Sequence, residues 1–78
     1  MINDEKLDKV IIEYKRVWNT KGWIPETRDS LAALALSDRG IEIFGDITTS
    51  MEKLLDIVKK SSSEQEVINT VMRIAKSK

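Results

Sequence analysis

The sequence predicts an all-α protein: a small bundle of four helices with one short extra element, either helix or strand, around residues 41–47. Apolar residues recur at spacings of three and four along most of the 78-residue chain. Helix-capping residues precede several of these stretches, and the one alternating segment has no obvious partner strand. A chain of this length has room for one core, so residues 1–78 are expected to form a single helical domain.

The first predicted helix runs from Asp4 to about Asn19. Its apolar side chains form one stripe, which is expected to face the core; they are Leu7, Val10, Ile11, Tyr14, Val17 and Trp18. Ile12 points off this stripe, which makes it a candidate partner-facing residue. Gly22 is a natural C-terminal stop because glycine accepts the left-handed conformation that ends many helices.

A connector containing Trp23 and Pro25 leads into the second predicted helix, from about Glu26 or Thr27 to Asp38. Pro25 disfavours helix before it and suits the start of the helix after it. Trp18 belongs to the core stripe, whereas Trp23 lies in a loop. There it either covers the core or anchors an interface, since tryptophan is enriched at binding hot spots.

Two capping boxes are predicted in the second half of the chain. The first pairs Thr49 with Glu52 and starts a helix that runs to about residue 60; the second pairs Ser63 with Glu66 and starts the last helix. The last helix is expected to close the core against the first. Between residues 41 and 47 the alternation also fits a strand, but helix or irregular structure is favoured.

The composition excludes several kinds of chemistry. There is no His and no Cys, so zinc-finger, iron–sulfur and His-based catalytic sites cannot form. Carboxylates could still bind Mg²⁺ or Ca²⁺ or act as a general acid and base, but such catalysis needs a cleft, for which 78 residues leave little room. We expect no enzyme, no cofactor and no metal. No apolar run reaches the roughly 20 residues of a membrane span, and the N-terminus is acidic rather than basic, so a cytoplasmic protein without membrane contact is expected.

The leading functional prediction is a non-enzymatic interaction protein: an adaptor, inhibitor or regulator that contacts a protein partner or its own copy as a homodimer. A chain this short buries only about 60% of its unfolded surface, and association is a common way to bury more. The candidate partner-binding residues are Ile12, Trp23 and Phe44.

A helix-turn-helix is an alternative interpretation of residues 10–44. There a long helix is followed by Gly22, Pro25, the pair Thr27-Arg28 and Leu31-Ala32; this order resembles winged-helix bacterial repressors. The resemblance implies a turn at Leu36-Ser37, a recognition helix from Asp38 to Asp46, and DNA contacts by Lys21, Arg28 and Arg39. The balance of 13 basic and 13 acidic residues does not favour nucleic acid.

The triplet Asp29-Ser30-Leu31 supports a third interpretation. It resembles the attachment site of acyl carrier proteins, with which the chain length and the order of four helices also agree, and the resemblance implies a phosphopantetheine arm on Ser30. The alternative for Ser30 is an ordinary residue in the first turn of a helix.

Overall fold

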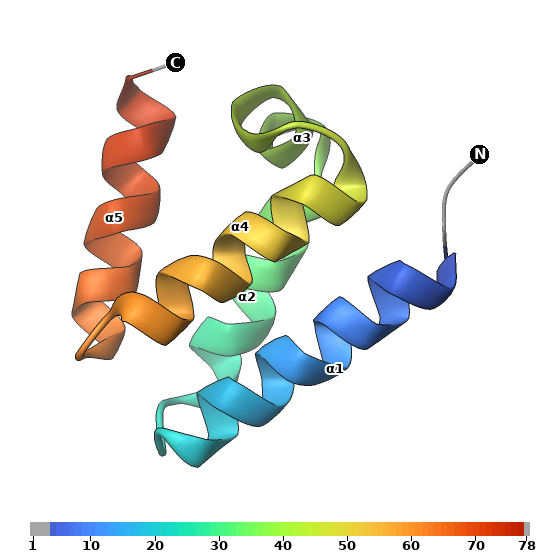
Figure 1. Cartoon of the computed structure of the whole chain (residues 1–78). Coiled ribbons are helices and arrows are strands. Elements are labelled where there is room, and N and C mark those ends of the chain that lie inside the picture. Colours follow the sequence, from blue (N-terminus) through green and yellow to red (C-terminus); the bar gives the residue numbers. More distant parts are fainter. Residues whose placement is uncertain (1–3, 78) are drawn as a thin grey trace.

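Residues 4–77 of the computed structural model form five helices joined by short turns (Figure 1). The helices are α1 (Asp4–Thr20), α2 (Pro25–Ala35), α3 (Asp38–Phe44), α4 (Ile47–Lys60) and α5 (Glu64–Lys76). These residues contain no strand, so the all-α prediction is confirmed. In the ambiguous segment around residues 41–47, residues 41–44 belong to helix α3, Gly45 and Asp46 connect the two helices, and Ile47 begins α4.

The end of α1 agrees with the sequence pattern. Gly22 has a φ of +74°, in the left-handed region, and its amide donates to the carbonyl of Asn19 at 3.0 Å. The chain then turns, and Pro25 is the first residue of α2. Because proline needs no amide partner there, it starts the helix without loss of a hydrogen bond.

The predicted end of the second helix at Asp38 is wrong, because α2 ends at Ala35. The side chain of Ser37 explains the difference. Its hydroxyl donates to the carbonyl of Leu34 at 2.5 Å and accepts from the amide of Gly40 at 3.2 Å. One serine thus terminates α2 and caps α3, since a short hydroxyl side chain competes with the helical backbone for its own hydrogen bonds.

The predicted capping box of Thr49 and Glu52 is also wrong. Helix α4 begins earlier, with Asp46 as its N-cap, and the Asp46 carboxylate accepts from the Thr49 amide at 2.8 Å. This contact holds the pKa of Asp46 below its usual value. Glu52 lies instead 3.6 Å from the ammonium of Lys6 on α1.

The predicted cap of the last helix is confirmed for one of its two hydrogen bonds. The Ser63 hydroxyl accepts from the Glu66 amide at 3.1 Å. The Glu66 carboxylate, however, reaches the amide and hydroxyl of Ser62 rather than the amide of Ser63.

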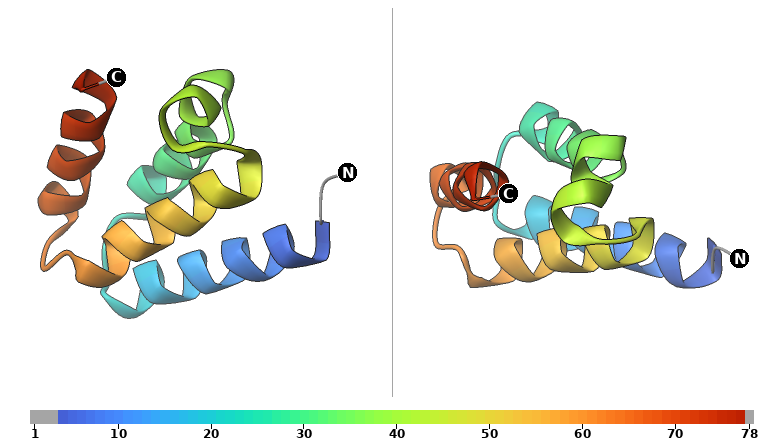
Figure 2. Two further views of the ribbon diagram at one scale, coloured as in Figure 1. Left: turned by 45° about the horizontal axis from the view of Figure 1, so that its top comes forward. Right: turned by 90° about the horizontal axis from the view of Figure 1, so that it is seen from above.

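The two long helices α1 and α4 lie side by side and run in the same direction (Figures 1 and 2). Lys6 and Glu52 mark one end of this pair, and at the other end the Lys21 ammonium donates to the carbonyl of Ser61 at 3.2 Å. The prediction that the last helix closes the core against α1 is therefore wrong, since α4 takes that place and α5 packs on α4. The buried core comprises Tyr14, Trp18, Ala35, Ile43, Phe44, Met51, Leu54, Val58, Val67 and Val71.

Candidate partner-binding site

A partly open groove of about 310 Å³ lies between α3, α4 and α5. Its lining is mostly aliphatic and aromatic, with two charged side chains; the residues are Ile43, Phe44, Lys53, Asp56, Ile57 and Ile74. Phe44, one of the three predicted anchors, is in this set, although only 6% of it is exposed. The groove is therefore a depression in the core surface rather than a patch of protruding side chains.

The two charged residues of the groove differ in their partners. The Asp56 carboxylate is paired with the Lys60 ammonium one turn further along α4, at 3.0 Å. Lys53 is exposed and has no ion-pair or hydrogen-bond partner among residues 4–77. The groove thus combines apolar walls with a free positive charge. This chemistry suits an apolar side chain that has a carboxylate beside it.

The position of α3 determines one wall of the groove, because α3 carries Ile43 and Phe44. A glycine allows this helix to cross the end of α2 closely: a β-carbon on Gly40 would lie 2.2 Å from the carbonyl oxygen of Leu34. The buried hydroxyl of Ser50 on α4 donates to the carbonyl of Ala35 at 2.6 Å and ties the same end of α2 to α4.

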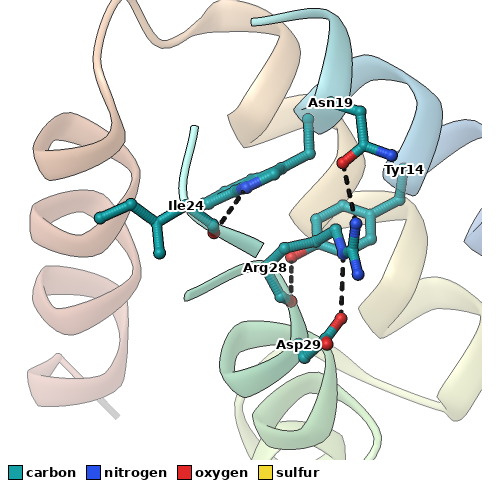
Figure 3. Close-up of polar contacts among 6 residues, drawn as sticks. Tyr14, Asn19, Ile24, Arg28 and Asp29 are labelled. Atoms are coloured by element: carbon teal, nitrogen blue, oxygen red, sulfur yellow. Dashed lines mark hydrogen bonds and ion pairs between the residues drawn. The ribbon is translucent and has the colours of Figure 1, made fainter. Parts of the chain in front are cut away.

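Trp23, the second predicted anchor, lies in a separate cluster at the junction of two loops. Its ring packs edge-on against Trp18, with 5.0 Å between centroids, and the Lys21 ammonium lies 5.0 Å from its centroid. The Trp18 indole N–H donates to the carbonyl of Ile24 at 2.9 Å (Figure 3). Trp23 is half-buried in this cluster and does not line the groove. Ile12, the third anchor, is 66% exposed on α1, also away from the groove.

The three basic residues predicted to contact DNA all have partners within the chain. The Arg28 guanidinium binds the Asp29 carboxylate and the Asn19 side-chain carbonyl, at 2.9 and 2.8 Å (Figure 3). Arg39 binds Glu42 on α3 and the carbonyl of Ala75 on α5, each at 3.2 Å. Lys21 holds the carbonyl of Ser61. Contact of these groups with phosphate would require exchange of these bonds and stays a prediction.

Ser30 lies in the second turn of α2, because that helix begins at Pro25. The expectation of a first-turn position is therefore wrong by one turn. Its side chain is exposed. Modification of Ser30 stays a prediction.

Of the groove residues, sequence reasoning proposed only Phe44 and missed Ile43, Lys53, Asp56, Ile57 and Ile74. Ile57 carried a signal, since it lies off the apolar stripe formed by Met51, Leu54, Leu55 and Val58. An apolar side chain off the stripe is either exposed or faces a third element. In the structure Ile57 is half-buried and faces the groove beside α5.

Comparison with known proteins gives no assignment. No protein-family model matches the chain, and no curated protein or solved structure matches it significantly. Within residues 4–77 no three acidic, His or Cys side chains gather as a metal site would require, and none of these helices is long and apolar enough to cross a bilayer. The geometry of the groove is therefore the basis for a functional proposal.

Proposed function

We propose that this chain is a non-enzymatic protein-binding module, an adaptor, inhibitor or regulator, and that it docks its partner in the groove between α3, α4 and α5. The observation that supports the proposal is the combination of apolar walls with the free ammonium of Lys53. Interfaces are built around apolar pockets that receive a partner's anchor, with polar groups at the rim that set its orientation.

The groove favours a particular partner chemistry. An aliphatic or aromatic side chain of the partner enters between Phe44, Ile57 and Ile74, and an acidic side chain next to it pairs with Lys53. Full burial of one such anchor contributes about 2 kcal/mol. The partner must therefore add contacts around the rim, and an amphipathic segment of the partner supplies them in the way that helix-in-groove recognition does.

Retention of the partner by groove variants tests the proposal. The tagged chain and three variants are immobilised and exposed to an extract of the source cells: I57E places a charge in the groove, K53E reverses the charge at its rim, and K15E makes the same change on an exposed lysine of α1. We expect one stoichiometric protein on the wild type and on K15E, less on K53E and none on I57E. Far-ultraviolet circular dichroism checks that each variant is folded.

Equal retention by all four proteins would show that the partner docks elsewhere and would contradict the proposal. Stronger retention by K53E would contradict the acidic character of the partner. The intact mass of the recovered bait tests the carrier interpretation at the same time, because a mass increment removed by S30A would replace the proposal. A titration with mixed duplex DNA at low salt tests the helix-turn-helix interpretation, since phosphate attraction is strongest there.

A further inference from the structure

One row of side chains on α5 is independent of the groove. Glu64, Ile68, Met72 and Lys76 are spaced four residues apart, so they form one i, i+4 ridge, which winds about 120° around the helix from Glu64 to Lys76. Met72 is 51% exposed and Ile68 is half-buried. Ile74 lies two residues after Met72, roughly 200° around the helix, and faces the groove instead.

Ile24 lies beside the N-terminal end of this ridge. Its amide donates to the Glu64 carboxylate at 2.7 Å, which places it beside the first turn of α5. Its side chain points toward α5 in Figure 3 and is 53% exposed. The ridge therefore carries one exposed large apolar side chain, Met72, next to the half-buried Ile68, and Ile24 lies beside its first turn.

The order of charges along the row identifies its occupant. The row reads acidic, apolar, apolar, basic from its N-terminal end, so a second copy that lies antiparallel presents the complementary order. Glu64 then faces Lys76 of the second copy, and Ile68 faces Met72 of the second copy. A twofold axis repeats each contact, as in most homodimers. Rows of this i, i+4 type pack against each other at a crossing angle of about −50°, the commonest class of helix packing.

We propose that this face of α5 is the interface of a homodimer. Both charged residues can form the ion pair across the interface. Lys76 is exposed and has no partner among residues 4–77, and Glu64 uses only one of its two carboxylate oxygens to accept from the Ile24 amide. The antiparallel arrangement also brings the partly positive N-terminus of each α5 helix near the partly negative C-terminus of the other, which is favourable. A single helix pair is smaller than the ~1,200 Å² of standard interfaces, so the dimer forms in the micromolar range or above.

Sedimentation equilibrium at low salt, from roughly 10 µM to 1 mM, tests the proposal. We expect the wild type to shift from monomer to dimer and M72E to stay monomeric throughout. The matched control is I12E, which introduces the same charge at the exposed isoleucine of α1 and is expected to dimerise like the wild type. A wild type that is monomeric at every concentration overturns the proposal, as does a dimer that I12E disrupts and M72E does not.

A charge exchange tests the antiparallel register. In E64K two lysines face each other at each end of the interface, and in K76E two glutamates do, so each variant alone is expected to dimerise at least ~10-fold more weakly. An equimolar mixture pairs two lysines on one chain with two glutamates on the other, and is expected to form a heterodimer at least as tight as the wild-type dimer. A mixture that associates no better than the separate variants overturns the register, whatever partner the groove binds.

Discussion

Replacement of Gly40 by alanine tests the close crossing of α2 and α3. A β-carbon at this position would lie 2.2 Å from the carbonyl oxygen of Leu34 and 2.6 Å from that of Ala35. Both atoms belong to the backbone, so no side chain can rotate away to make room. Ordinary contact between carbon and oxygen is roughly 3.5 Å. The two helices must therefore move apart by about 1 Å.

Two opposite contributions set the expected change in stability. Insertion of a methyl group into a packed contact costs about 1–3 kcal/mol, and a backbone obstruction lies at the upper end of that range. Alanine in place of glycine inside a helix stabilises the folded state by about 1 kcal/mol, because the unfolded chain then has fewer backbone conformations to lose on folding. The net expectation for G40A is a loss of about 2 kcal/mol. Domains of this size are stable by about 4–12 kcal/mol in total, so the loss is easily measured.

Urea denaturation measures this loss, with circular dichroism for the helices and tryptophan fluorescence for the core around Trp18. The control is S30A, which makes an alanine at an exposed position of α2 and is expected to change the free energy of unfolding by less than about 0.5 kcal/mol. If G40A were as stable as the wild type, or more stable, helix propensity would outweigh the steric contact and the crossing described here would be wrong.

Three further predictions concern single polar groups. Burial raises the pKa of Tyr14, the only tyrosine, so absorbance at 295 nm should show no phenolate until the protein unfolds. The unfolded chain loses this proton near pH 10 whereas the folded chain keeps it, so stability should fall above about pH 10. S50A should cost about 1–2 kcal/mol in urea denaturation, because the Ala35 carbonyl loses a buried donor. D46A should lower the melting temperature at pH 7; the difference should shrink as the pH falls below about 4, since the depressed pKa of Asp46 stabilises the fold only while the carboxylate is ionised.

Much of the fold could be predicted from local signals in the sequence. The periodicity of α1, Pro25 at the start of α2 and Ser63 at the start of α5 each act within a few residues, and each has the expected effect. The start of α4 could not be predicted in this way. Asp46 and Thr49 are both good capping residues three positions apart, and Asp46 takes the role in the structure.

The groove was harder to anticipate because its walls come from three separate segments. Phe44, Ile57 and Ile74 are brought together only by the packing of α3 and α5 on α4. No periodicity within one helix indicates which helix will be its neighbour. For the same reason the expected pairing of the last helix with the first was wrong: α4 and α5 are both strongly amphipathic, and their sequences do not distinguish which one covers α1.

The parallel pairing of α1 and α4 has a consequence for how the chain folds. Lys6 and Glu52, which mark one end of this pair, are more than half the chain apart in sequence. The closure of successive helical hairpins cannot complete the core, because α1 packs mainly on α4, which lies two helices beyond its neighbour α2 in the sequence. Contacts of such long sequence separation slow folding relative to an up-and-down bundle. During synthesis the main packing partner of α1 is therefore absent until the ribosome has released α4.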